Sequence, residues 1–220
     1  MAHRESQRKV ILDAAEDLFI QKGIDAATIG QIATAGGVTR ATIYQYFANK
    51  QEIAWALFEN VIAGWHEDAE RDVLSAITSG ADRIEKFLHS ALNFAIHDPR
   101  QAGFLAQFNV LYARERFSRR MVEVFQHEFG PRGNFIITIL QEGVADGSLR
   151  PGLDPALTHS AILNFAAAIQ LRVGLLGTLV EVEYGMSNDN IFREMVRIFV
   201  DGLRAERPCA DPADAKSTKE

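Results

Sequence analysis

The most informative segment of this chain spans residues 28–50 and reads TIGQIATAGGVTRATIYQYFANK. Thr28 and Thr39 each precede a short run with apolar residues at helical spacing. A threonine hydroxyl is a good N-cap because it accepts a hydrogen bond from a backbone N–H of the following turn. Gly36-Gly37 lies between the two runs, and glycine readily adopts the left-handed conformation found just past a helix end. The segment therefore predicts two short helices joined by a glycine turn.

The second of these helices, expected over residues 40–47, has one apolar face and one polar face. Ile43 and Phe47 face inward, whereas the outward face carries an arginine, small residues and two tyrosines. This outward face suits a DNA groove, because arginine makes bidentate hydrogen bonds to guanine and small apolar side chains contact a thymine methyl group. The residues that suit phosphate oxygens are Thr28, Thr39, Tyr44, Tyr46 and Lys50. A plain helical corner with a solvated arginine is the alternative.

A longer set of positions matches one known family in sequence order. These positions are Ile11-Leu12-Asp13-Ala14-Ala15, Leu18-Phe19, Gly23, Thr28, Ile32-Ala33, Gly37-Val38, Thr39, Ile43-Tyr44, Tyr46-Phe47 and Asn49-Lys50. Through them, residues 8–55 resemble the N-terminal domain of the TetR family of bacterial transcriptional regulators. The resemblance implies base contacts from Arg40, Ala41 and Thr42, and backbone contacts from the threonines, tyrosines and lysine named above. Position 46 is often histidine in this family and is tyrosine here.

The rest of the chain also predicts helices, so the expected fold class is all-α. Further helices are expected over residues 4–22, 50–77, 81–97, 101–112, 116–146 (interrupted near 130–131), 154–182 and 191–206. No segment has the alternation typical of a β-strand. The expected domains are a three-helix, helix-turn-helix DNA-binding domain (1–50), a larger helical ligand-binding and dimerisation domain (51–206) and a disordered polar tail (207–220).

Charge is divided unevenly along the chain. Residues 1–50 hold six Lys/Arg and five Asp/Glu, whereas all 220 residues hold 23 Lys/Arg and 29 Asp/Glu, for a net charge of −6. An acidic body is repelled by DNA and helps to orient the near-neutral head toward it. The polar N-terminus does not resemble a signal peptide, and the one cysteine, Cys209, excludes an intrachain disulfide. We therefore expect a cytoplasmic protein.

Two C-terminal segments carry apolar stripes that suit self-association. The first stripe is Ile162, Phe165, Ala166, Ile169 and Val173, and the second is Ile191, Met195, Ile198 and Phe199. Two such helices from each of two subunits form a four-helix interface, as the resemblance also implies. An intrachain core is the alternative for part of each stripe. A membrane span over residues 161–180 is disfavoured, because Arg172 at mid-helix costs ~2.5–3.5 kcal/mol on insertion scales.

The middle of the chain is rich in aromatic and polar residues, the combination that lines small-molecule pockets. The expected ligand-binding residues are Trp65, Phe94, His97, Phe104, Phe108, Tyr112, Phe165 and Arg172. Simple packing is the alternative for each aromatic residue, and an acidic partner is the alternative for Arg172. His89, Asn93 and His97 share one helix face, but no carboxylate or cysteine joins them at ligand spacing, so we expect no metal and no cofactor.

Three functions compete on these observations. The first is a homodimeric repressor that binds a palindromic operator in double-stranded DNA and is released by a small-molecule effector. The second is an all-helical small-molecule-binding module without DNA binding. The third is an enzyme, but the sequence has no Gly-rich phosphate loop, nucleophile elbow, HExxH or paired cysteine motif. We expect the first, with DNA, the effector and a second copy of the chain as partners, and no membrane.

Overall fold

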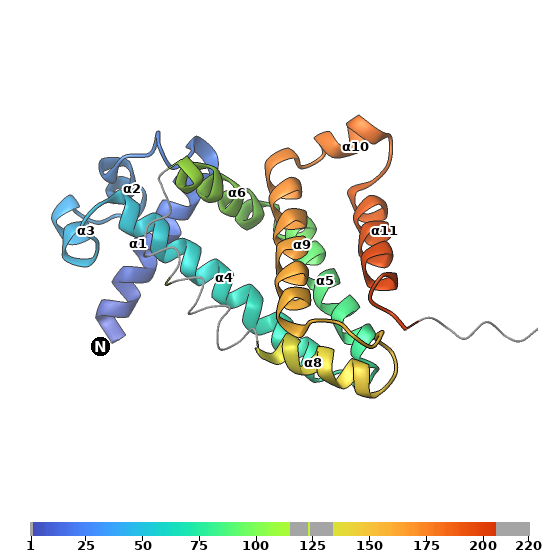
Figure 1. Cartoon of the computed structure of the whole chain (residues 1–220). Helices are drawn as coiled ribbons and strands as arrows, with labels where there is room; N and C mark the ends of the chain where they lie inside the picture. Colours follow the sequence, from blue (N-terminus) through green and yellow to red (C-terminus); the bar gives the residue numbers. More distant parts are fainter. Residues whose placement is uncertain (1, 115–122, 124–133, 206–220) are drawn as a thin grey trace, which may run out of the picture.

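The computed structural model describes residues 2–114, 123 and 134–205, and these residues are almost entirely helical (Figure 1). The first three helices, here called the head, are α1 (Ala2–Lys22), α2 (Ile29–Ala35) and α3 (Arg40–Tyr46). The Thr28 hydroxyl accepts a hydrogen bond from the Gln31 backbone N–H, and the Thr39 hydroxyl accepts one from Thr42. Gly37, between α2 and α3, has φ +62°. The two short helices and their glycine turn are therefore confirmed.

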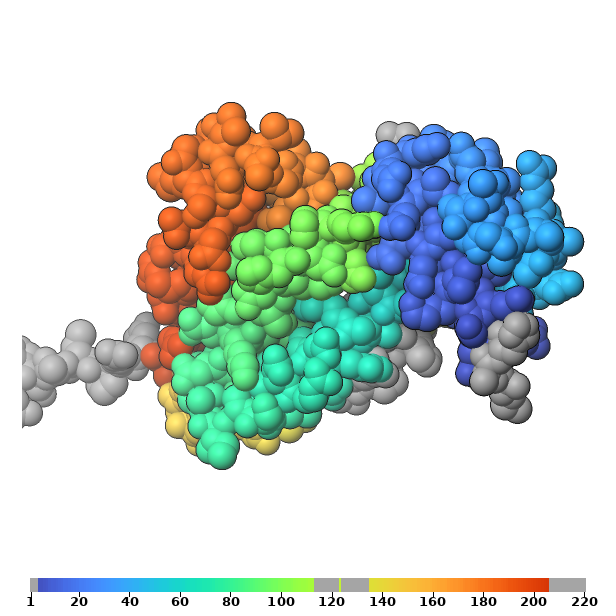
Figure 2. Space-filling view, turned by 180° about the vertical axis from the view of Figure 1, so that it is seen from behind, coloured from blue at the N-terminus to red at the C-terminus, as the bar shows by residue number. Residues whose placement is uncertain are grey.

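A long helix, α4 (Lys50–Leu74), leads from the head into the rest of the chain, here called the body (Figure 1). Its N-cap is Asn49, whose side chain accepts from the Glu52 backbone N–H. The next described helices are α5 (Gly80–His97), α6 (Pro99–Arg114), α8 (Asn134–Ala145) and α9 (Pro155–Leu176). Asp154 caps α9 with proline in its first turn, as the sequence predicts. In the space-filling view, head and body are two lobes joined by α4 and α6 (Figure 2).

The C-terminal part differs from the expected helices at residues 154–182 and 191–206. Instead of running to residue 182, α9 ends at Leu176, because Gly177 takes φ +50°. A short helix, α10 (Leu179–Tyr184), and then α11 (Asn188–Asp201) follow. The side chain of Asn188 donates to the Gly177 carbonyl at 2.9 Å and so ties the start of α11 to the end of α9.

The chain leaves α11 after Asp201 and forms an isolated antiparallel bridge between Leu149 and Arg204, which no sequence pattern indicates.

Two further expectations concern the middle of the chain and its C-terminus. The described part of the expected helix 116–146 is α8 together with residue 123, and the rest of it lies outside the described residues. The tail expected over residues 207–220 also lies outside them.

The apolar side chains form two cores that meet along α4. The first core joins the head to the first half of α4, through Ile53, Phe58 and their neighbours, and to Phe104 and Phe108 of α6. The second core joins the second half of α4 to α5, α8, α9 and α11. The domain boundary expected at residue 50 stays a prediction, and the first core is shared by helices on both sides of it.

Helix α9 is by length and composition able to cross a membrane. In this structure it instead packs against α5 and α6. The approach to α6 is close at Gly174, where a Cβ atom would lie 2.3 Å from the carbonyl oxygen of Ala102. Only a residue without a side chain permits this crossing.

Candidate DNA interface, association face and junction groove

The outer surface of α3 is exposed and presents the residues expected to contact bases. Arg40, Ala41 and Tyr44 are exposed, Thr42 is half-buried, and Ile43 on the opposite side is fully buried in the first core. The buried isoleucine fixes the rotation of the helix, so the polar face points to solvent. The arrangement matches the outward face that the sequence predicts.

The guanidinium of Arg40 lies against the backbone of α2 at Gly30. A Cβ atom built on Gly30 would lie 2.5 Å from Arg40 Nη2. Within the described residues the structure records no ion pair for Arg40, so its five N–H donors are available to a partner. Thr39 and Thr42 are joined at the start of α3 by a hydrogen bond of 2.9 Å between their hydroxyl oxygens.

Tyr46 and Lys50 have structural contacts that the sequence did not indicate. The Tyr46 hydroxyl donates to Gln7 Oε1 of α1 at 3.2 Å. Lys50 Nζ donates to the carbonyl oxygens of Asp25 and Ala27 at 2.7 and 2.9 Å. Tyr46 thus uses its single O–H donor inside the head, and Lys50 uses two of its three N–H donors. Phosphate contact by these two residues stays a prediction. A Tyr46 O–H that donates to phosphate has to leave Gln7, whereas Lys50 keeps one N–H donor for a phosphate oxygen.

The association stripe predicted on α9 is largely an intrachain surface. Ile162, Ala166, Ile169 and Val173 are at most 6% exposed and belong to the second core. This part of the expected dimer interface is therefore wrong for the chain as folded, because α5 and α6 already cover it. Phe165, on the edge of this stripe, is half-buried.

The opposite side of α9 and the predicted stripe of α11 form one apolar surface, here called the α9–α11 face. Its members are Leu157, Phe165, Leu171, Leu175, Ile191, Met195, Ile198 and Phe199. Leu157 is 71% exposed and Ile198 is 60% exposed. The rings of Phe165 and Phe199 stack with centroids 4.5 Å apart and so join the two helices. This face crosses two helices and has no cover among the described residues.

The eight residues expected to share one ligand pocket lie in four different places. Phe104, Phe108 and Tyr112 recur every four residues along α6 and are buried in the first core. The Phe108 ring stacks on that of Phe58 at 4.3 Å. Phe165 belongs to the α9–α11 face. Arg172 pairs with Glu183 of α10 at 2.8 Å, so the alternative of an acidic partner is correct.

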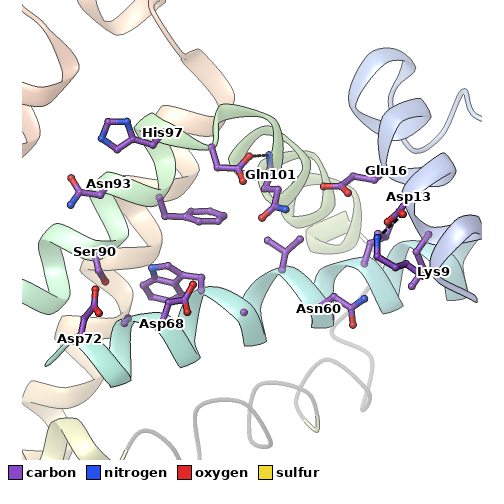
Figure 3. A pocket seen from close by; sticks show the side chains of 18 of the residues that line it. Lys9, Asp13, Glu16, Asn60, Asp68, Asp72, Ser90, Asn93, His97 and Gln101 are labelled. Carbon is purple, nitrogen blue, oxygen red and sulfur yellow. Dashed lines mark hydrogen bonds and ion pairs between the residues drawn. The ribbon is translucent and has the colours of Figure 1, made fainter. Parts of the chain in front are cut away.

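The remaining three, Trp65, Phe94 and His97, line a pocket of about 810 Å³ between α1, α4, α5 and the start of α6, here called the junction groove (Figure 3). Its lining residues are Glu5, Arg8, Lys9, Leu12, Asp13, Glu16, Leu57, Asn60, Val61, Gly64, Trp65, Asp68, Ala69, Asp72, Ser90, Asn93, Phe94, His97, Asp98 and Gln101. The rings of Trp65 and Phe94 are 6.4 Å apart by their centroids. The groove therefore lies where the head meets the body.

The chain is similar to known proteins in both sequence and fold. A family model described as bacterial regulatory proteins, tetR family, matches residues 11–57, which contain α2, α3 and most of α1. The repressor KstR2 of Mycolicibacterium smegmatis is 26% identical over 162 residues, 71% of this chain and 74% of that protein. Over residues 11–57 this chain is therefore similar to the TetR family of bacterial regulatory proteins.

Two further comparisons cover nearly the whole chain. The uncharacterised regulator YdeS of Bacillus subtilis is 29% identical over 203 residues, 91% of each chain. The structure of FadR from Bacillus subtilis, solved with stearoyl-CoA, superposes with a TM-score of 0.67 at 21% identity and covers 89% of this chain and 98% of that one. The likeness to FadR establishes a shared fold.

The junction groove contains functional candidates that the sequence did not indicate. Glu5, Glu16, Asp68 and Asp72 occupy ordinary solvated helix positions in the sequence, and folding alone gathers them from α1 and α4. Burial, and next the negative charge of Asp98, raises the pKa of the Glu16 carboxyl above its usual value. No local pattern identifies this group, because its members lie on separate helices.

The histidines on the face of α5 that carries His89, Asn93 and His97 have different surroundings. His89 Nε2 lies 3.8 Å from Glu85 Oε1, and burial lowers the pKa of His89. His97 and Asn93 line the junction groove instead. Within residues 2–114, 123 and 134–205, no group of three or more His, Cys, Asp or Glu side chains is placed to hold a metal ion.

Proposed function

We propose that this chain is a cytoplasmic, homodimeric transcriptional repressor of the TetR family that binds a palindromic operator through α3 and is released by a small-molecule effector. The observation that carries the proposal is the exposed face of α3, where Arg40, Ala41 and Tyr44 project from a helix anchored by buried Ile43. It lies within the segment that matches the family model. The relative KstR2 is named a transcriptional repressor.

In this proposal the residues of the head divide between bases and phosphates. Arg40 reads base edges together with Ala41 and Thr42, since arginine pairs bidentately with guanine. Thr28, Thr39 and Tyr44 contact phosphate oxygens, with Tyr46 and Lys50 as further candidates. Phosphate contacts fix the position of α3 without reading sequence.

The α9–α11 face is the proposed dimer interface. Its exposed leucines and isoleucines lie on two helices, and two such pairs related by a two-fold axis form a four-helix interface. A two-fold dimer also brings two copies of α3 to successive major grooves, ~34 Å apart. The interface proposed here replaces the buried stripe of α9 with Leu157, Leu171 and Leu175, and keeps the stripe of α11.

The junction groove is the proposed effector site. Its walls come from α1 of the head and from α4 and α5 of the body, so a bound molecule contacts both lobes. A ligand shifts the equilibrium between two arrangements of the lobes by the difference in its binding free energy for the two arrangements. A change in that placement alters the spacing of the two α3 helices and releases the operator.

The first test is operator binding by the unliganded chain. A palindromic duplex is selected from random sequences and its affinity is measured by fluorescence anisotropy. Arg40→Ala is expected to lose about 1–3 kcal/mol of binding free energy per subunit and to relax sequence preference, because it removes a base contact. Tyr44→Ala is expected to weaken binding to all sequences alike, because it removes a phosphate contact.

The matched control for this test is Arg150→Ala, which removes an exposed arginine outside the head. It is expected to bind the operator as the unchanged chain does. If no selected duplex binds, the chain is instead an effector-binding module without DNA recognition. If Arg150→Ala weakens binding as much as Arg40→Ala does, base recognition by Arg40 of α3 is refuted.

A further inference from the structure

We propose that the junction groove binds a lipophilic organic cation, an inference that rests on the proposed function in taking this groove as the effector site. The groove brings together an excess of carboxylates, an aromatic wall and a buried donor without a partner. Each of these features narrows the chemical class of the ligand.

The charge of the lining is strongly negative. Six carboxylates line the groove, namely Glu5, Asp13, Glu16, Asp68, Asp72 and Asp98, against the two basic side chains Arg8 and Lys9. The basic pair does little to offset this excess. Lys9 is held by Asp13 at 2.7 Å, and the guanidinium of Arg8 lies over the Phe47 ring, 5.4 Å from its centroid.

Part of the carboxylate group has no cationic partner among the described residues. Asp68 pairs with Arg71, and Asp98 accepts from the Gln101 backbone N–H at the start of α6. Glu5, Glu16 and Asp72 have no ion pair in the residues that the structure describes. A cation in the groove would relieve the repulsion among these groups, whereas an anion would increase it.

The apolar part of the groove favours an organic cation over a metal ion. Leu12, Leu57 and Val61 line it together with the rings of Trp65 and Phe94. Aromatic ring faces attract organic cations, most strongly where water is excluded. The volume of about 810 Å³ also lies within the ~300–1,000 Å³ typical of small-molecule pockets.

A second, independent observation points to a ligand. Trp65 is only 9% exposed, and its Nε1 atom is buried without a hydrogen-bond partner. Leaving a buried donor unpaired costs free energy, so such a group is normally satisfied by a bound molecule or water. An acceptor atom on the ligand, close to its apolar body, would satisfy this N–H.

The labelled side chains show how such a ligand spans the junction. Lys9, Asp13 and Glu16 approach from α1, while Asp68 and Asp72 lie farther along α4, opposite Ser90 and Asn93 of α5 (Figure 3). Carboxylates thus stand at both ends of the groove. A cation held between them contacts the head and the body at once.

The proposal is tested with two ions of the same shape and opposite charge, tetraphenylphosphonium and tetraphenylborate. Isothermal titration of the full chain without DNA is expected to show binding of the phosphonium that weakens as salt rises. Binding of the borate is expected to be at least tenfold weaker, because the carboxylates repel it. The phosphonium is also expected to change tryptophan fluorescence, and Trp65→Phe is expected to abolish that change.

Charge-neutral variants locate the site. Glu16→Gln and Asp72→Asn are each expected to weaken phosphonium binding several-fold, since each removes a carboxylate of the groove. Glu70→Gln, which removes a carboxylate of α4 outside the groove, is expected to leave it unchanged. Asp72 is exposed, so its variant keeps the test valid even if Glu16→Gln folds poorly.

Several outcomes overturn the proposal. They are no phosphonium binding, equal binding of the two ions, and equal effects of Glu70→Gln and Asp72→Asn. Operator binding is measured with neither ion present, so a chain that binds its operator but not the phosphonium overturns this inference and leaves the proposed function standing.

Discussion

At the scale of single residues, a basic side chain can either stabilise the fold or remain available to a partner. The contacts that it makes in the folded chain distinguish the two roles. Lys50 and Arg40 both look like DNA-contacting cations in the sequence. Lys50 holds the carbonyl groups that precede α2, whereas Arg40 has no ion pair among the described residues and lies on the exposed face of α3. Arg40 is therefore the stronger candidate for base recognition.

Glu16 gives a residue-scale prediction about pH. Because burial and Asp98 raise its pKa above the ordinary value of 4.5, the folded chain binds this proton more tightly than the unfolded chain. Stability is therefore lost as pH rises from about that ordinary value through the raised one. Glu16→Gln lacks this loss and is expected to unfold at a higher temperature than the unchanged chain at pH 7.

The measurement is thermal unfolding followed by circular dichroism between pH 4 and pH 7. The advantage of Glu16→Gln is expected to shrink as pH falls toward 4, where the native carboxyl is protonated. Glu70→Gln controls for the loss of one negative charge from α4. A Glu16→Gln variant that is less stable than the unchanged chain at pH 7 would refute this account of Glu16.

At the scale of elements, glycine sets how closely the helices of the body approach. Gly80 of α5 meets Gly143 of α8, and Gly174 of α9 meets the backbone of α6 at Ala102. These contacts are backbone against backbone, so no rotamer change can make room for a side chain. The contact at Gly174 sets how closely α9 approaches α6, and the other side of α9 forms the α9–α11 face.

Gly174→Ala is expected to destabilise the chain by about 1–3 kcal/mol, the usual cost of overpacking. The added Cβ would lie 2.3 Å from the Ala102 carbonyl oxygen, and this clash outweighs the ~1 kcal/mol that alanine gains over glycine in a helix. Gly64→Ala is the matched control, because a Cβ there meets nothing within 4 Å. Chemical denaturation is expected to show a lower free energy of unfolding for Gly174→Ala and an unchanged or higher one for Gly64→Ala. An equal increase in both variants would show that α6 and α9 are not in close contact.

At the scale of the whole molecule, one face of α9 completes the core and the other is left for a partner. The stripe from Ile162 to Val173 is covered by the same chain, while Leu157, Leu175 and Ile198 remain exposed. Large apolar side chains left exposed on neighbouring helices are typical of an association site. The two-fold dimer proposed for DNA binding uses this surface.

Ile198→Glu is expected to convert the dimer to a monomer, because it places a charge on the α9–α11 face without changing a residue of either core. Ile77→Glu is the control, since Ile77 is fully exposed and lies outside that face. Sedimentation velocity is expected to give a dimer for the unchanged chain and for Ile77→Glu. Operator affinity should fall with the loss of the dimer. A dimeric Ile198→Glu variant would exclude this interface.

The accuracy of sequence-based prediction depends on how far apart the determining residues lie. The caps at Thr28, Thr39 and Asp154 and the turn at Gly37 involve neighbours in sequence, and all were predicted. The end of α9 was missed, because an apolar run continues through Gly177 and only its φ of +50° shows the break. The ligand residues were predicted as one group and lie in four places.

The sequence by itself determined the all-α class, the glycine-turned helix pair of the head and its exposed polar face, because capping and helical periodicity act over three to four residues. Only the tertiary structure decided which face of α9 is core, that Lys50 and Tyr46 hold the head together, and that carboxylates of α1 and α4 line one groove. These features depend on contacts between helices distant in the chain. Their geometry is set by the packing of α4, α6 and α9 rather than by any local pattern.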